Sequence, residues 1–175
     1  MPPLRPYVHL WGSPVHNGGS SDAVATASES PSEEAEAAML RITVGDLVFT
    51  ARWEDDAAPE TCAAFRGLLP FQNRIIQARW SGESAWIPLG DLDVGLRFEN
   101  ATSYPSPGEI LLYPGGFSET EILFPYGHTC FASKLGQLAG NHFLTLVEGT
   151  EQLKELGRRV VWDGAQEIEF AAQAS

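Results

Sequence analysis

The sequence has little positive charge and no long apolar run. Its 175 residues include 11 lysines and arginines against 23 aspartates and glutamates, a net charge of −12. Nucleic acids and anionic lipids attract proteins through cations, so this balance argues against both as partners. No segment reaches the roughly 18 apolar residues of a membrane-spanning helix, and the N-terminus lacks the apolar core of a secretory signal. We therefore expect a cytoplasmic protein with a solvated acidic surface.

Cysteine and histidine are also scarce. Cys62 and Cys130 are the only cysteines, one in a helical pattern and one in an apolar segment. Two distant thiols do not make a metal site, and nothing indicates an oxidising compartment that would favour a disulfide. We expect both to be buried as small apolar side chains. His128 and His142 have no suitably spaced partners, so the sequence predicts no metal site and no cofactor.

Composition divides the chain at residue 38. Residues 1–38 are small, polar and acidic, with proline and glycine interruptions and no periodic apolar face. Such a segment cannot bury enough surface to offset its ordering entropy, so we expect a disordered tail. Docking of this tail on the domain is the alternative. Met39 directly precedes the first strand pattern, so translation could also begin there. Residues 39–175 form the predicted domain.

Most of this domain has the alternating pattern of short strands. A hairpin is predicted around Gly45 and Asp46, and a second around the turn SGE. The segment LGDLDVGL is ambiguous and could form a short helical turn. The predicted strands are LRITV, LVFTARW, RIIQARW, SAWIP, GEILLYPG, ETEILFPYG, NHFLTLVEG and AQEIEFAA.

Two segments change to a helical period. In DDAAPETCAAFRGLLP, an aspartate can cap the helix and Pro59 suits its first turn. The segment TEQLKELGRRV predicts a second short helix with Thr150 as its cap. The apolar residues at helical spacing are Ala58, Cys62, Phe65 and Leu69 in the first helix and Leu153 and Leu156 in the second.

About eight strands joined by tight turns, with one helix near each end of the domain, predict a mainly β fold. We expect a closed antiparallel eight-stranded barrel capped by two short α-helices. Closure removes the exposed strand edges that invite pairing with other chains. The two amphipathic helices are expected to close the two open ends of the barrel.

Three segments resemble cyclophilins in the expected order. They are the first helix APETCAAFRGLLP, the strand NRIIQ, and the last strand and helix FLTLVEGTEQLKELG. The middle of the chain, with WSGE, YPSPGEILLYPGG and EILFPYG, is more similar to an uncharacterised family of small bacterial cyclophilin-like proteins. The resemblance implies a bacterial protein with a cyclophilin-like barrel.

The resemblance also implies where a prolyl isomerase site would lie. Arg74 matches the arginine of the family's R-I-I string, and His142 lies near the family's catalytic histidine. However, Arg79 stands where cyclophilins have a pocket phenylalanine, and the family's glutamine is lost in WSGE. A charged side chain there would disfavour an apolar proline ring. Isomerase activity is therefore the disfavoured alternative, and the sequence leaves open whether the protein is an enzyme.

The segment from Arg79 to Trp86 is rich in residues suited to binding. Arg79, Trp80, Glu83 and Trp86 could form a polar pocket under an aromatic wall, because a guanidinium binds carboxylates bidentately. The alternative is a hairpin salt bridge between Arg79 and Glu83 with two core tryptophans. Both interpretations remain open from the sequence.

A glycine-rich corner, LYPGGFSETE, completes the candidate site with Tyr113. Glu109 and Glu121 flank it; a catalytic carboxylate pair is conceivable, but acidic turn residues are common. The main hypothesis is a binding protein for a small molecule or short peptide at the barrel rim. The alternatives are a degenerate prolyl isomerase and a structural homo-oligomeric subunit with Trp53 or Trp162 at its interface. The predicted ligand-binding residues are Arg79, Trp80, Glu83, Trp86, Tyr113 and His128.

Overall fold

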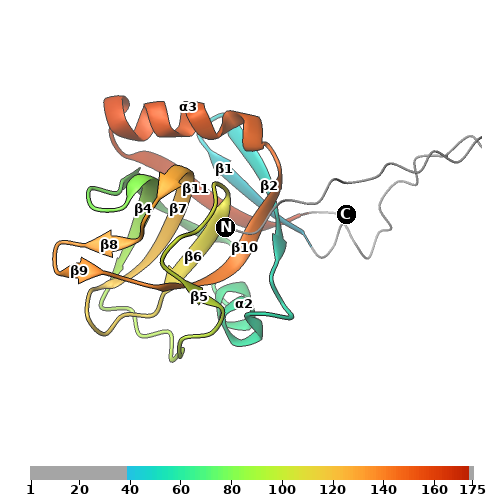
Figure 1. Cartoon of the computed structure of the whole chain (residues 1–175). Coiled ribbons are helices and arrows are strands. Elements are labelled where there is room, and N and C mark those ends of the chain that lie inside the picture. Colours follow the sequence, from blue (N-terminus) through green and yellow to red (C-terminus); the bar gives the residue numbers. More distant parts are fainter. Residues whose placement is uncertain (1–38, 174–175) are drawn as a thin grey trace, which may run out of the picture. The chain divides into compact units, whose positions relative to one another are not determined.

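The structure is a computed structural model that describes residues 39–173, so the predicted tail lies outside the described residues. The described chain forms a β-barrel with a helix at each of two opposite ends (Figure 1). None of its helices is long and apolar enough to cross a membrane. The barrel strands are β1 (Met39–Val44), β2 (Leu47–Trp53), β3 (Phe71–Gln77), β4 (Gly82–Gly90), β6 (Glu109–Tyr113), β7 (Thr120–Thr129), β10 (Gly140–Glu148) and β11 (Gln166–Ala172).

The barrel is closed by antiparallel pairing throughout. Its strands follow the order β2–β1–β11–β3–β4–β7–β6–β10, and β10 returns to pair with β2. The first strand is therefore a neighbour of the last, with Leu40 opposite Ala172 and Val44 opposite Ile168. The predicted closed antiparallel eight-stranded barrel is confirmed.

Three strands of two residues each were not predicted from the sequence. β5 (Ala101–Thr102) pairs with β10, while β8 (Ala132–Ser133) and β9 (Gly136–Gln137) form a small hairpin outside the barrel sheet. Two residues are too few to show an alternation. Residues 92–99 have no regular secondary structure, so a helical turn in LGDLDVGL is not formed.

The barrel interior is filled by apolar side chains at alternate positions. In β1, Leu40, Ile42 and Val44 are fully buried, whereas Arg41 between them is exposed. Strand residues i and i+2 share one face of a sheet, so this pattern directs the apolar set inward. Burial of one such side chain contributes about 1.5–3 kcal/mol. The interior is therefore a packed core, and candidate ligand sites lie outside it.

Helix α2 (Pro59–Arg66) closes one end of the barrel (Figure 1). Phe65 is fully buried, and its ring packs edge-on against Phe143 and Phe170 with centroid distances of 5.0 and 5.3 Å. Leu69, just after the helix, packs partly buried against the same core. The predicted apolar face of this helix is confirmed.

The start of α2 differs from the prediction. Ala58 is the N-cap residue and makes no side-chain cap hydrogen bond. Asp55 instead accepts two hydrogen bonds from Arg66, at 2.6 and 2.8 Å. The backbone N–H of Thr61 in the first turn donates to the Glu99 carboxylate at 2.6 Å. The expected aspartate cap is wrong because the carboxylate comes from a distant loop.

A C-terminal helical segment closes the other end of the barrel. Leu153 and Leu156 are buried in the core, as predicted. Gly149, with φ of 81°, is the N-cap residue, so Thr150 does not cap the helix. The segment comprises η1 (Thr150–Gln152), α3 (Leu153–Arg158) and the π-helical turn η2 (Arg159–Asp163).

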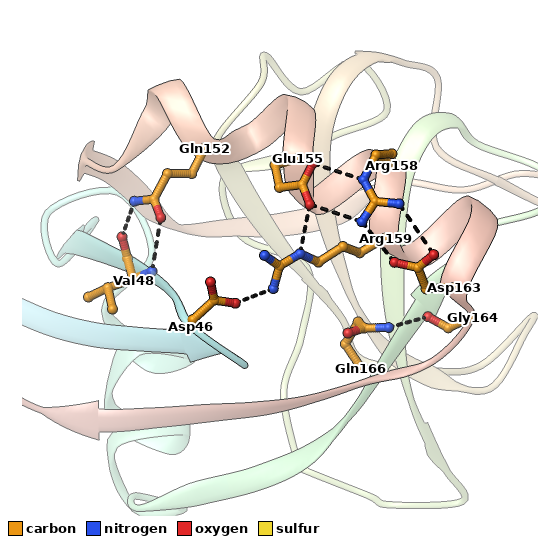
Figure 2. A network of polar contacts seen from close by, with 9 residues as sticks. All are labelled: Asp46, Val48, Gln152, Glu155, Arg158, Arg159, Asp163, Gly164 and Gln166. Carbon is orange, nitrogen blue, oxygen red and sulfur yellow. Dashed lines mark hydrogen bonds and ion pairs between the residues drawn. The ribbon is translucent and has the colours of Figure 1, made fainter.

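Polar contacts connect this segment to the β1–β2 hairpin (Figure 2). Arg159 binds Asp46 in the hairpin turn and Glu155 one helical turn earlier. The Gln152 side chain exchanges two hydrogen bonds with the backbone of Val48, at 2.7 and 3.3 Å. Partly exposed ion pairs contribute at most about 1 kcal/mol each. These contacts therefore orient the segment, while the buried leucines supply most of its stability.

The two cysteines have different environments. Cys62 is buried, as expected, and its thiol donates to the Phe143 carbonyl oxygen at 3.4 Å. Cys130 is free and exposed, so the expectation that both would be buried is wrong. It lies in the turn after β7, where its backbone N–H donates to the Ser81 carbonyl oxygen. No disulfide joins the two.

Candidate functional site

A cleft of about 320 Å³ opens on the outer face of the barrel. Residues 76–81 at and after the end of β3, the outer face of β4 and β7, residues 118–119 and the β8–β9 hairpin all line it. The alternation of β7 identifies the face. Ile122 and Phe124 belong to the barrel core, whereas Glu121 and Leu123, at the alternate positions, point outward into the cleft.

A second hydrophobic cluster lies on this outer face of the barrel and makes it apolar beside the cleft. Trp86 of β4 is half-buried against this cluster and lines the cleft. Trp80, in the loop between β3 and β4, also lines the cleft and is 59% exposed. Exposed indoles next to a cleft offer large surfaces for stacking. The cluster, called the outer cluster below, consists of Ala78, Leu111, Tyr113, Leu123, Phe131 and Leu138.

Ser81 builds one wall of the cleft. Its buried hydroxyl donates to the Ala132 carbonyl oxygen at 3.0 Å and accepts from the Ala132 backbone N–H at 3.1 Å. This double contact ties the loop of residues 78–81 to the β8–β9 hairpin, two segments separated by 51 positions. Sequence reasoning missed this role because a serine in a turn carries no signal for a distant partner.

Glu121 is the unusual group in the cleft. It is only 7% exposed, and it lies in the middle of the sheet, opposite Pro88 of β4 and Tyr113 of β6. Among the described residues, no donor forms a hydrogen bond or an ion pair with its carboxylate. Burial raises the pKa of Glu121 to about 7, and the negative charge of Glu119 adds to this rise. The cleft thus contains a carboxyl group that titrates near neutral pH.

From the sequence, Glu109 and Glu121 are explained as common acidic residues beside the glycine-rich corner, each near the start of a predicted strand. Glu109 does accept a hydrogen bond from the backbone N–H of Ser106, at 2.7 Å, as a turn residue would. Glu121 instead lies within β7 and is buried. The outward-facing Leu123 was the available signal, because an apolar residue on both faces of a strand indicates that its outer face is covered too.

Two cations share the cleft with Glu121. Arg79 and Lys134 are exposed residues of the lining, and neither forms an ion pair within residues 39–173. The alternative of an Arg79–Glu83 salt bridge is wrong. Glu83 accepts a hydrogen bond from the His128 backbone N–H at 2.7 Å and lines a separate hollow. Because β3 ends at Gln77, Arg79 and Trp80 lie in a loop rather than in the predicted strand.

The predicted ligand-binding residues therefore separate into two groups. Arg79, Trp80 and Trp86 line the cleft. Tyr113 is buried beneath it, and its hydroxyl accepts hydrogen bonds from the backbone N–H groups of Phe117 and Ser118 at 3.0 and 3.3 Å. Tyr113 thus holds the glycine-rich corner in place. Glu83 and His128 are hydrogen-bonded to each other and are not among the residues that line the cleft.

The two weak catalytic candidates also lie apart from the cleft. Arg74 is exposed on β3 and pairs with Glu167 at 3.3 Å. His142 lies in a separate polar cluster: its Nε2 is 2.8 Å from the Thr145 hydroxyl, which donates to Glu54 at 2.5 Å. Burial opposes the charge of Glu54, but hydrogen bonds from Thr145 and Arg52 outweigh it and lower its pKa. Arg74 and His142 do not form one site.

A larger hollow of about 610 Å³ lies between α3 and the β4–β7 sheet. Tyr126 and Trp162 provide its aromatic surface. Most of its charged groups already have partners: Glu83 accepts from His128, and Arg158 binds both Glu155 and Asp163. Groups that are already paired gain less from a ligand. The cleft beside Trp86 is therefore the stronger candidate site.

Metal binding has no support in the described part of the chain. Residues 39–173 contain no group of three or more histidine, cysteine, aspartate or glutamate residues arranged to hold a metal ion. The cleft offers aromatic, cationic and carboxylate side chains to a ligand.

Comparisons with known proteins agree with the barrel fold. McbB, whose structure was determined in complex with tryptophan, is similar with a TM-score of 0.60 and 17% identity; the match covers 78% of this chain but only 45% of McbB. The hypothetical protein AF2241 from Archaeoglobus fulgidus has a TM-score of 0.52 and 16% identity, with 78% and 95% covered. At such identities, the likeness shows the fold alone.

No curated protein matches the sequence. The family profile described as a protein of unknown function (DUF3830) matches residues 40–172, and the chain belongs to this family.

Proposed function

We propose that this barrel binds a small organic molecule in the cleft beside Trp86. The observation that carries the proposal is the combination within one cleft of two indoles, two cations and a buried carboxyl group, with none of these charged groups paired to another of residues 39–173. Small-molecule sites are concave and largely apolar, with a few polar groups that fix orientation. The cleft volume of about 320 Å³ suits a ligand of about the size of an amino acid. The end of a short peptide is the related alternative.

The choice of a first probe follows from the fold. McbB was solved with tryptophan, and its likeness to this chain concerns the fold only. Tryptophan is nevertheless a suitable probe, because an indole ring can stack on Trp80 and Trp86. Indole compounds of different charge extend the panel without changing the ring.

The test is a titration followed by NMR, with the amide signals of Ser81 and Ala132 as reporters of the cleft. We expect at least one indole compound to shift these signals saturably. Trp80→Ala should weaken that binding about three- to tenfold, the value of one aromatic contact. Trp162→Ala is the matched control, because Trp162 is 79% exposed and lies outside the cleft. The proposal fails if no compound shifts the reporters, or if both variants weaken binding equally.

The cyclophilin-like assignment remains part of this proposal. The closed barrel with a helix at either end is compatible with it. We propose ligand binding without prolyl isomerisation, because the Arg74 guanidinium is paired with Glu167 and the exposed Arg79 lines the cleft where an apolar wall would be needed. A protease-free peptide assay is expected to give the isomerisation rate of buffer. Catalysis that Arg74→Ala abolishes would overturn this choice.

Self-association is a second candidate function, favoured by one observation. Trp162 and Val161, next to each other at the end of the C-terminal helical segment, are 79% and 46% exposed. Large exposed apolar side chains are common in protein interfaces. We propose that they contribute to a homo-oligomer. Light scattering after size exclusion should give a multiple of 19.0 kDa for the full chain and a smaller mass for Trp162→Ala. A wild-type monomer would contradict this.

A further inference from the structure

The position of Glu121 restricts the chemistry of the ligand. β7 runs between β4 and β6, so the carboxyl group of Glu121 emerges from the centre of the sheet rather than from an edge. Its neighbours across the two strands are Pro88, whose side chain has no donor, and Tyr113, whose hydroxyl lies against the backbone N–H groups of Phe117 and Ser118 and forms no hydrogen bond with Glu121. The adjacent strands therefore leave the carboxylate without a side-chain donor.

A buried carboxylate without a donor is costly. Its oxygen atoms keep some contact with solvent through the cleft, but removing most of the water from a charged group that has no partner is still far more unfavourable than burying a neutral one. The other charged groups of the lining do not solve this: Glu119, just before β7, repels it, and Arg79 and Lys134 are exposed and form no ion pair with it in the described chain. A donor that enters the cleft would satisfy Glu121. The raised pKa of this group agrees with its unsatisfied state.

The apolar surroundings define the rest of the ligand. Trp86 and Leu123, on the adjacent strands β4 and β7, occupy opposed positions in the sheet and both line the cleft beside Glu121. A group bound to Glu121 would thus be attached to an apolar body that covers these side chains. Arg79 and Lys134, which have no ion-pair partner in the part of the chain that the structure describes, line the same cleft and can bind a negative group of the ligand.

We propose that the ligand is a small amphiphilic zwitterion of the amino-acid type, in which an ammonium group binds Glu121, an apolar body packs on Trp86, and a carboxylate lies toward Arg79 and Lys134. This inference rests on the proposed function of the cleft. A charge-assisted hydrogen bond between an ammonium group and a carboxylate is among the stronger polar contacts in proteins. Binding lets Glu121 ionise with a partner, which resolves its burial.

The experiment compares three ligands that share one ring system. Tryptophan has both charged groups, tryptamine lacks the carboxylate, and indole-3-propionate lacks the ammonium group. Their affinities for the full-length protein are measured by calorimetry at about pH 8. We expect tryptophan to bind most tightly, and indole-3-propionate to bind at least about tenfold more weakly because it loses the ammonium–carboxylate contact.

Two variants assign the effect to one residue. Glu121→Gln keeps the shape of the side chain but removes its charge, so the affinity for tryptophan and tryptamine should fall about tenfold or more while that for indole-3-propionate does not fall. Glu60→Gln, the control, removes an exposed carboxylate of α2 that is not part of the cleft lining and should change all three affinities little. Thermal unfolding of each variant confirms that it is folded.

The outcomes separate this inference from the proposed function. If the indole compounds bind in the cleft but Glu121→Gln leaves the affinities for tryptophan and tryptamine unchanged, the assignment of the ammonium group is wrong and the binding function stands. If indole-3-propionate binds as tightly as tryptophan, the zwitterion class is wrong. If none of the three binds, both the inference and the proposed function are overturned.

Discussion

The backbone N–H and the hydroxyl of Thr61 both donate to one carboxylate oxygen of Glu99, at 2.6 Å each. Thr61 lies in the first turn of α2, where backbone N–H groups have no partner within the helix. The carboxylate also lies at the end of the helix where negative charge is favourable. Buried Asn141 holds both partners, because its amide donates to the Thr61 hydroxyl and accepts from the Glu99 backbone N–H.

Replacing Glu99 should therefore destabilise the barrel. We expect Glu99→Ala to lower the free energy of unfolding by about 1–3 kcal/mol, since two donors of Thr61 lose their acceptor. Urea unfolding measures the change. Glu60→Ala, which removes an exposed carboxylate from the same helical turn, is the control and should cost less than about 1 kcal/mol. Equal losses in the two variants would contradict a specific capping role.

Because Glu121 is buried, we expect the free energy of unfolding to depend on pH. In the unfolded chain its carboxyl group has the ordinary pKa of 4.5, whereas in the folded chain the pKa is about 7. Between these values, the folded state holds the proton more tightly, so this group lowers stability progressively as the pH rises. Above about pH 7 its full cost is present, about 1–3 kcal/mol after allowance for its contact with solvent in the cleft.

The matching measurement is denaturant unfolding of wild type and Glu121→Gln between about pH 5.5 and 8.5. The advantage of the variant should grow up to about pH 7 and then level off, because glutamine does not ionise and Glu121 is fully ionised above that pH. The other charged groups of the cleft, Glu119, Arg79 and Lys134, are the same in both proteins. A stability difference that stays constant with pH would show that burial does not control the ionisation of Glu121.

Gly157 allows α3 to approach the sheet closely. A Cβ atom at this position would lie 2.5 Å from ring atoms of Tyr126, whose hydroxyl donates to the Gln77 side chain at 2.6 Å. Alanine favours a helix by up to about 1 kcal/mol over glycine, but overpacking of a buried contact costs about 1–3 kcal/mol or more. We expect Gly157→Ala to be less stable than wild type in thermal unfolding. Lys154→Ala, on the exposed side of α3, should be nearly neutral; a stabilised Gly157→Ala would disprove the close contact.

The two thiols should differ in reactivity. Burial, followed by the negative charge of Asp55, raises the pKa of Cys62 to about 11, which suppresses the reactive thiolate. Cys130 is exposed. A colorimetric thiol reagent at neutral pH should therefore modify one cysteine per native chain and two in denaturant. Cys130→Ser should abolish the native reaction, whereas rapid modification of Cys62 in the folded protein would contradict its burial.

Local sequence patterns predicted the parts of the fold that depend on local physics. The alternation in LRITV and the helical spacing of Cys62 and Phe65 both identified the residues that face the core. Contacts between distant segments left no such pattern. The Ser81–Ala132 contact that forms the cleft wall and the Thr61–Glu99 cap join residues 51 and 38 positions apart.

The residues of the candidate site were predicted only in part, because some of them come together through contacts between distant segments. Composition alone marked Arg79, Trp80 and Trp86 as suited to binding, and they lie together at the cleft. Glu121 stands in the predicted strand ETEILFPYG, but its burial was not predicted, because it follows a glycine-rich corner where acidic residues are common. Its burial depends on the outer cluster, which Phe131 and Leu138 complete from a later part of the chain.

The pairing of the first strand with the last makes the domain suitable for circular permutation. The carbonyl oxygen of Met39 accepts a hydrogen bond from the Gln173 backbone N–H at 3.3 Å, so a short glycine linker can join these two positions. New termini could then be placed at the exposed Gly116–Phe117 corner without changing any strand neighbour. The order in which the strands leave the ribosome would change, while the cylinder they form would stay the same.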